Sequence, residues 1–432
     1  MKKGDCENAI PHLQRAVEAQ EPVTHIYINL HACYYKAGRH HESVAVALSG
    51  TQRFPGDESM RKYLALARHG LGWQYMREQK IGLAREQFAQ ALELQPDHAD
   101  IMAAFGITLL RSSDSSDVHQ SMDLLYQARK KSPDTDYIQN NLMAAYYKSL
   151  QLHVKHKEYD EADTLIDLIY NDRSEHPEIY LRGAKSELAV SDMLDELTAG
   201  PFMIAARALE DKHSLTELAT CMQSVMEKWP NLYRLRHWYG VAVTKAGDAR
   251  RGHALRKQAY GDYRRIVQPK EHPLLLEVPL RGWIYPCTKP DSDLFSHSGL
   301  FQNATDYTHA TETSLQNLSY EKPVYAPIDG VLVEVDNTHP TDARVIIQIQ
   351  SGIKVELIHL KAGSIKLRKG EHVKTGQFLG LLGWKENAHL HMHVWGLHGV
   401  TIPYRYKRFQ TKNGQAKNNQ SPKRLELFYY NK

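Results

Sequence analysis

The segment GWKENAHLHMHVWG, residues 383–396, contains a run of alternating histidines and predicts a β-strand near the C-terminal end of the chain. His389, His391 and His393 are two residues apart, which is not the spacing of one helical face. In a strand, successive side chains point to opposite faces, so these three imidazoles project from the same side. Imidazoles aligned in this way can hold a metal ion or share protons. On its own, the motif is also compatible with a solvated, histidine-rich strand.

The segments before this motif also have the pattern of β-strands. They are KPVYAPIDGVLVEVD (322–336), ARVIIQIQSGIKVELIHL (343–360) and GEHVKTGQFLGLLG (370–383). Short β-branched runs are separated in them by Asp-Gly, Ser-Gly and Thr-Gly pairs, which are typical of hairpin turns. The pattern predicts a compact all-β domain over residues 291–404.

Residues 1–265 have a different periodicity. Small or apolar residues recur at offsets of 4 and 7, which places them on one face of a helix, and a proline follows each set. The clearest set is Ala84, Phe88 and Ala91, followed by Pro96. The segments AREQFAQALELQPDHAD (84–100) and KAGRHHESVAVAL (36–48) resemble tetratricopeptide repeats. The resemblance implies an all-α solenoid of stacked helix pairs whose concave surface binds a protein partner.

The first repeat lacks its first helix, because Gly4 occupies the position equivalent to Gly38. Repeat arrays normally end in a polar cap, so we expect the natural chain to begin upstream of Met1. The printed start has no secretory signal and no transmembrane segment is expected.

Composition is that of a globular protein. The chain has 432 residues, enough for about two or three domains, with 42% hydrophobic residues and a formal charge of +4. A net charge this small does not indicate an obligatory nucleic-acid partner. Five prolines in 268–293 predict an extended linker over residues 266–290. Residues 405–432 hold eight lysines and arginines and one glutamate, which predicts a flexible basic tail, with a specific contact to a nucleic acid or another anionic polymer as the alternative.

Three blocks now suggest a chemical site. HSGLFQNATDY (297–307) contains Asp306, VELIHL (355–360) contains His359, and HLHMH follows. With PVYAPIDGVLVEV, they resemble in order and spacing the lysostaphin-type (LytM-like) zinc metallopeptidases, which cut peptidoglycan cross-bridges. The resemblance covers about residues 280–400. It implies a barrel-sandwich fold, with Asp306 and His391 as zinc ligands and His389 and His359 as catalytic residues that do not bind the metal.

The chain departs from this family at the first zinc ligand. The family has a histidine four residues before the aspartate, and that position holds Gln302 here, or Asn303 with a shift of one residue. Neither amide is a good zinc ligand. His297, in an HSG segment ahead of an insertion, is a candidate replacement, and His309 and His393 are others. A further insertion of about ten residues lies between Asp306 and Pro323.

Several functions stay open at this point. The first is a zinc endopeptidase acting on peptidoglycan peptides in the bacterial cell envelope, as the resemblance implies. The second is a catalytically inactive peptidase-like module that binds wall peptides or activates an amidase. The third is a scaffold in which the β domain is a structural end-cap. Lipoyl or biotinyl carriers share the PVYAPIDGVLVEV pattern, but Lys369-Gly370 lacks the neighbours of a carrier lysine.

Overall fold

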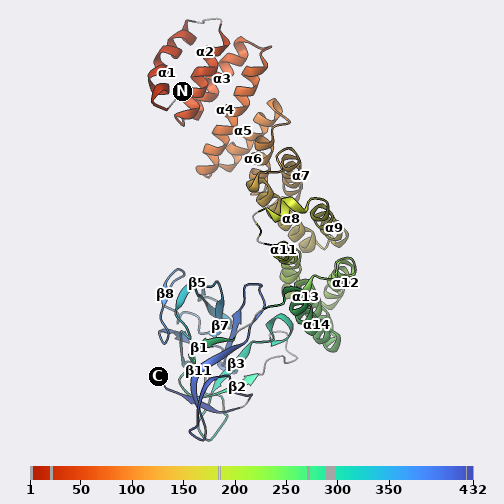
Figure 1. The fold of residues 1–432 in the computed structure, drawn as a ribbon, viewed down its shortest axis with the longest axis vertical. Helices are drawn as coiled ribbons and strands as arrows, with labels where there is room; N and C mark the ends of the chain where they lie inside the picture. Colours follow the sequence, from red (N-terminus) through yellow and green to blue (C-terminus); the bar gives the residue numbers. More distant parts are fainter. Residues whose placement is uncertain are drawn as a thin grey trace. The chain divides into compact units, whose positions relative to one another are not determined.

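The computed structural model describes residues 3–19, 23–182, 184, 186–269, 273–288, 297–424 and 426–431. The chain divides into two compact units, residues 1–190 and residues 191–432. The first unit is helical, and the second joins three further helices to a β domain (Figure 1).

Consecutive helices of the first unit pack against one another (Figure 1). They are α1 (Lys3–Glu18), α2 (Thr24–Lys36), α3 (His40–Arg53), α4 (Glu58–Arg77), α5 (Ile81–Leu94), α6 (Ala99–Leu109), α7 (Ser115–Lys131), α8 (Asp136–His156), α9 (Tyr159–Glu175) and α10 (Pro177–Leu181). Helix α11 (Glu187–Ala208) begins in this unit and ends in the second.

The predicted apolar positions are the ones that hold these helices together. Ala84, Phe88 and Ala91 of α5 are completely buried. A Cβ added at Gly72 of α4 would lie 2.6 Å from the Phe88 ring, so only glycine lets this ring approach. Helix α4 begins at a capping residue, because the Asp57 carboxylate accepts hydrogen bonds from two backbone amides of the first turn. The tetratricopeptide-like helical part is thus confirmed.

One charged pair is buried in the first unit. Both guanidinium nitrogens of Arg129 on α7 donate to Asp172 on α9, at 2.6 and 2.5 Å, and the Tyr180 hydroxyl also donates to Asp172. Arg129 is 2% exposed and Asp172 is 5% exposed. Removing one partner of such a pair leaves an uncompensated charge in the interior.

We therefore expect Asp172→Ala to lower the free energy of unfolding of the helical unit by about 3–5 kcal/mol. Asp117→Ala is the matched control, because Asp117 accepts two hydrogen bonds from Arg85 at the surface, both 2.7 Å long. An exposed pair of this kind is worth about 0–1 kcal/mol. Urea unfolding followed by circular dichroism measures both. Similar losses in the two variants would contradict the expectation.

The second unit contains α12 to α14 and the strands. The helices are α12 (Lys212–Lys228), α13 (Tyr233–Ala246) and α14 (Ala249–Val267). The strands are β1 (Leu274–Leu276), β2 (Gly282–Thr288), β3 (Thr305–His309), β4 (Pro323–Tyr325), β5 (Gly330–Asp336), β6 (Ala343–Gln348), β7 (Lys354–Leu360), β8 (His372–Val373), β9 (Phe378–Leu381), β10 (Leu390–Trp395), β11 (Tyr404–Thr411), β12 (Ala416–Gln420) and β13 (Phe428–Tyr430). Two short 3₁₀ helices are η2 (Gly299–Phe301) and η3 (Lys385–Asn387).

Within the described residues, eleven strands form one sheet in the order β1-β11-β13-β2-β3-β10-β7-β6-β5-β8, with β12 paired to β11. Strands β4 and β9 form a separate pair. Leu390, Met392 and Val394 of β10 are completely buried in the hydrophobic core, with side chains from β3, β6 and β7. This alternation leaves His391 and His393 on the other face of β10.

Two expected boundaries are corrected. The linker expected over 266–290 includes β1 and β2, and its apolar side chains Leu276 and Ile284 lie in the core. The flexible tail expected over 405–432 includes β11, β12 and β13. In β11 the buried aromatic residues Tyr404 and Tyr406 alternate with exposed basic ones, so the basic composition belongs to the solvent face of a strand.

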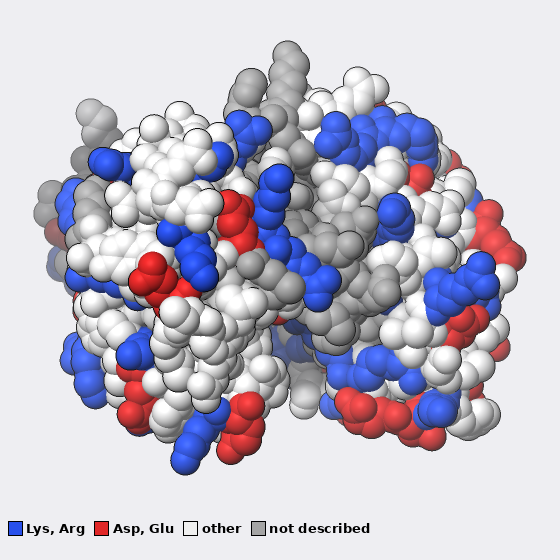
Figure 2. Space-filling model, turned by 90° about the horizontal axis from the view of Figure 1, so that it is seen from below, with Lys and Arg blue, Asp and Glu red and all other residues white. Residues whose placement is uncertain are grey.

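Charged side chains of both signs lie scattered over the face of the protein that Figure 2 shows. On the face shown in Figure 2, lysine and arginine lie among aspartate and glutamate, which agrees with the small net charge of +4. Among the described helices, none is both long enough and apolar enough to span a membrane.

Candidate metal centre

Strand pairing brings the first two candidate ligands together. Strand β10 runs antiparallel to β3, and the register places His391 directly opposite Asp306. The His391 Nδ1 atom lies 2.8 Å from the Asp306 carboxylate. Both side chains are less than 10% exposed. Their juxtaposition follows from the ladder, because directly opposite residues of an antiparallel pair project to the same side.

The third candidate ligand comes from the loop before η2. His297 Nε2 lies 3.0 Å from the second oxygen of Asp306, and its ring stacks on His391 with centroids 4.8 Å apart. One ligand atom from each of His297, Asp306 and His391 lies within 4.8 Å of the others. The Thr288 hydroxyl donates to the same Asp306 oxygen as His297, at 2.6 Å. We refer to these three ligand candidates as the His-Asp-His cluster.

The protonation states suit a cation. Burial lowers the pKa of His297 to about 4, so its imidazole is neutral near pH 7, the form that binds metals. Burial raises the pKa of the Asp306 carboxyl, but the hydrogen bond from His391 and the surrounding histidines together lower it more. The net pKa lies well below its usual range, so Asp306 is a carboxylate.

Two more histidines overlook the cluster. His389 Nε2 lies 3.7 Å from Asp306, while its Nδ1 lies 2.7 Å from the Asn387 carbonyl oxygen. His359 Nδ1 lies 2.8 Å from the Thr341 carbonyl oxygen. A carbonyl only accepts, so in both residues Nδ1 carries a proton, and in the neutral form of each ring Nε2 is the nitrogen with the lone pair. The two rings lie 4.4 Å apart, and the Trp384 ring contacts both.

The backbone of His359 is strained. Its φ angle is +69°, a left-handed conformation that costs free energy in a residue with a Cβ atom. Burial, with a smaller contribution from His389, lowers the pKa of His359 to about 4, so this ring is also neutral near pH 7. Strain of this kind is common at functional sites.

A chain of hydrogen bonds extends behind His391. His391 Nε2 lies 3.1 Å from His393 Nδ1, and His393 Nε2 lies 2.9 Å from the Glu356 carboxylate. Glu356 also accepts a hydrogen bond from the Trp395 indole. Burial raises the pKa of Glu356, but His393, Trp395 and Arg344 together lower it more, to about 2. Glu356 was not among the residues predicted for the site, although an acidic residue within the apolar strand VELIHL is a signal that could have identified it.

The structure shows which of the candidates for the third zinc ligand lies near Asp306 and His391. The Asn303 side chain donates to the Thr401 carbonyl oxygen, so it is engaged outside the cluster. His309 alternates with Thr308 and shares the face of Tyr307, opposite that of Asp306. His393 lies behind His391. Of the residues considered, His297 is the one that the structure brings into the cluster.

The insertion before Pro323 reaches the site. Asn317 donates to the carbonyl oxygen of Ala388, the residue directly before His389. The Leu315 carbonyl oxygen accepts a hydrogen bond from Tyr285 on β2. The insertion is therefore anchored at both the strand before the cluster and the segment that carries the catalytic candidates.

Residues 314–403 match the model of peptidase family M23. The chain carries an M23 domain. The matched residues include His359, His389 and His391, whereas His297 and Asp306 precede them. The M23 domain thus contains both catalytic candidates and one of the three ligand candidates within the match.

Other similarities cover parts of the chain. It is 26% identical to the Arabidopsis thaliana protein CTR9 homolog over 129 residues, which are 30% of this chain and 11% of that protein. The chain thus spans about a tenth of the length of the curated relative it matches. It is similar to Helicobacter pylori Csd3, with 22% identity, a TM-score of 0.23, and coverage of 30% of this chain and 32% of that one.

The helical part has a neighbour of its own among solved structures. The C-terminal part of a TPR repeat-containing protein from Cytophaga hutchinsonii is 12% identical, with a TM-score of 0.30. The match covers 62% of this chain and 95% of that one.

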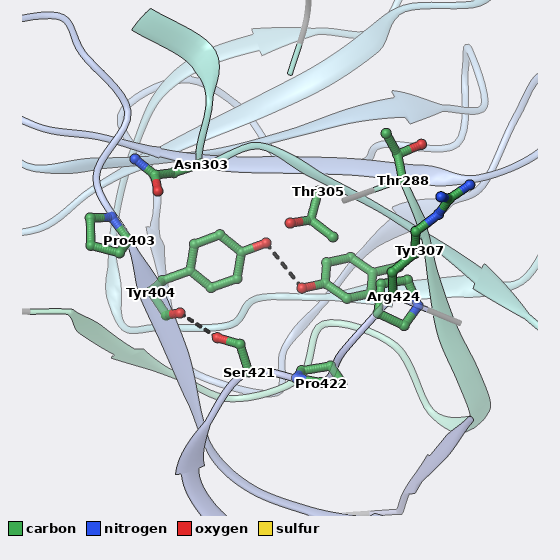
Figure 3. Close-up of a pocket in the computed structure, with 10 residues that line it drawn as sticks. Thr288, Asn303, Thr305, Tyr307, Pro403, Tyr404, Ser421, Pro422 and Arg424 are labelled. Carbon is green, nitrogen blue, oxygen red and sulfur yellow. Dashed lines mark hydrogen bonds between the residues drawn. The ribbon is translucent and has the colours of Figure 1, made fainter. Parts of the chain in front are cut away.

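A small cavity lies beside the M23 domain's cluster, on the other face of β3. Figure 3 shows the Tyr307 and Tyr404 hydroxyls pointing toward one another in it, 3.0 Å apart. The cavity holds about 140 Å³ and includes Thr305, which alternates with Asp306 along the strand. Thr288 lines this cavity and also contacts Asp306. Thr288 therefore lies between the cavity and the His-Asp-His cluster.

Proposed function

We propose that the M23 domain is a zinc-dependent peptide hydrolase that acts on peptidoglycan peptides in the bacterial cell envelope. The observation that carries the proposal is the convergence of His297, Asp306 and His391. His297 there takes the place of the histidine that the family has four residues before the aspartate and that this chain lacks. The substrate class and the envelope location rest on the family resemblance.

The residues of the cluster fit zinc. Two imidazoles and one carboxylate form the type of three-ligand set that catalytic zinc sites use while a fourth position stays open. The ligand atoms lie close enough to share one ion, and both Asp306 oxygens face an imidazole. When bound, zinc supplies Lewis-acid chemistry, which lowers the pKa of water to about 7 and polarises a carbonyl group.

The two remaining histidines supply proton transfer. In its neutral form, His389 presents the lone pair of Nε2 toward the cluster, so it can accept a proton from an attacking water molecule. The His359 ring lies against His389, with the ring centroids 4.4 Å apart, so it can take part in the same proton transfer. The carbonyls of Asn387 and Thr341 fix the two tautomers.

The proposal is tested with purified full-length chain. We expect about one equivalent of zinc after mild dialysis, and zinc-dependent release of peptide fragments from isolated peptidoglycan, with the His389→Ala variant as the inactive control. Less than about a tenth of an equivalent of zinc would overturn the metal site. Full zinc occupancy without peptide release would favour the alternative, a peptidase-like module that binds wall peptides and does not cleave them.

A further inference from the structure

We propose that the helix pair α13–α14 forms part of the outer layer of the metal centre and positions His297. The inference rests on the proposed function, since it assigns the helices a role toward the ion that the cluster binds. His297 differs from the other two ligand candidates, because Asp306 and His391 lie on paired strands and His297 lies in a loop.

Two buried side chains of the helices hold this loop. Arg256 of α14 donates from Nε to the Ser298 hydroxyl, at 2.8 Å. The Leu300 amide donates to Nδ1 of His237 on α13, at 3.3 Å. Arg256, His237 and Ser298 are completely buried. Ser298, the residue next to His297, and Leu300 are thus both hydrogen-bonded to the helices.

The backbone between these two contacts lies directly on the helices. Gly299 has a φ angle of +60°, which favours glycine. A Cβ added there would lie 2.6 Å from the Arg256 carbonyl oxygen and 2.6 Å from His237 Nδ1. The loop therefore follows the helix surface at a distance that no other residue type allows.

Phe301 links the helices to the outer histidine chain. Its ring contacts His237 and Trp238 on α13, with centroids 5.1 and 6.1 Å away. It also contacts His393 and Trp395 on β10, at 6.1 and 5.1 Å. One side chain of the His297 loop thus packs between α13 and the strand that carries His391.

The loop is also held from the opposite side. The Leu300 carbonyl oxygen accepts hydrogen bonds from the Thr401 amide and hydroxyl, at 2.8 and 3.0 Å. Arg234 of α13 donates to the His398 carbonyl oxygen, at 2.6 Å. The helix pair therefore anchors both the loop that bears His297 and the turn against which this loop packs.

Outer contacts of this kind typically change metal affinity by 10- to 100-fold. We expect Ser298→Ala to weaken zinc binding by about 10-fold, because removing one oxygen atom breaks the hydrogen bond that ties the residue next to His297 to Arg256. Arg256→Lys should produce a similar loss, and the double variant should lose no more than either single one. Arg251→Lys is the matched control, since Arg251 bridges α14 to Tyr239 of α13.

Zinc affinity is measured by competition with a chromogenic chelator, and metal-free stability is measured in parallel. Affinity equal to that of the unmodified chain in Ser298→Ala and Arg256→Lys would overturn the inference, as would an equal loss in Arg251→Lys.

A second readout needs no metal: in His237→Leu, amide hydrogen exchange at Leu300 should accelerate in the metal-free protein. If exchange accelerates but the unmodified chain binds no zinc, the proposed function fails and the positioning of the loop stands. Unchanged exchange overturns the positioning itself.

Discussion

Replacing His391 with alanine is expected to lower zinc affinity by more than 100-fold. The loss of outer partners alone costs 10- to 100-fold, and His391 is one of three direct ligand candidates. Its removal leaves His297 and Asp306, a two-donor set that holds zinc poorly. Strand β10 should keep its place in the sheet in this variant, because backbone hydrogen bonds hold it to β3 and β7.

The measurement is zinc content after dialysis together with competition against a chelator. His309→Ala is the control, because His309 is a buried histidine of β3 whose side chain lies on the face opposite Asp306. We expect this control to retain its zinc. Retention of zinc in His391→Ala, or its loss in His309→Ala, would mean that the His-Asp-His cluster is not the metal site.

Replacing His359 with alanine is expected to keep the metal and reduce kcat by about 10²- to 10⁴-fold, the usual contribution of a proton-transfer residue. His359 lies against His389 and bonds to the Thr341 carbonyl, so no ligand candidate loses its hydrogen bond to Asp306. Burial lowers the pKa of His359 to about 4, so the ring is neutral near pH 7.

Zinc content and peptide release are measured on the same preparation of this variant. His372→Ala, an exposed histidine on β8, serves as the control and should be as active as the unmodified chain. If His359→Ala loses its zinc, His359 is a ligand and the division into ligands and catalytic residues is wrong. If the His359→Ala variant keeps both zinc and activity, His359 is not a catalytic residue and His389 acts alone.

Short-range pattern was enough to predict most of the fold. The offsets of 4 and 7 identified the buried positions of α5, because the period of a helix is set by local backbone geometry. The alternation in HLHMH placed His391 and His393 on one face of β10 for the same reason. The basic composition after residue 404 was misleading, since exposed lysines and arginines alternate there with buried aromatic residues.

The sequence by itself determined the helical repeats, the strand with aligned histidines and the identity of Asp306, His391, His389 and His359 as site candidates. It did not determine which of several residues completes the cluster. Only the tertiary structure showed that His297 lies beside Asp306. A loop that joins residues nine positions apart can take many paths, and the sequence alone does not fix which one it takes. The path of this loop depends on contacts with Arg256 and His237, which are distant in sequence. Strand periodicity is a local property of the chain, whereas the convergence of a loop ligand on a sheet depends on what packs behind the loop.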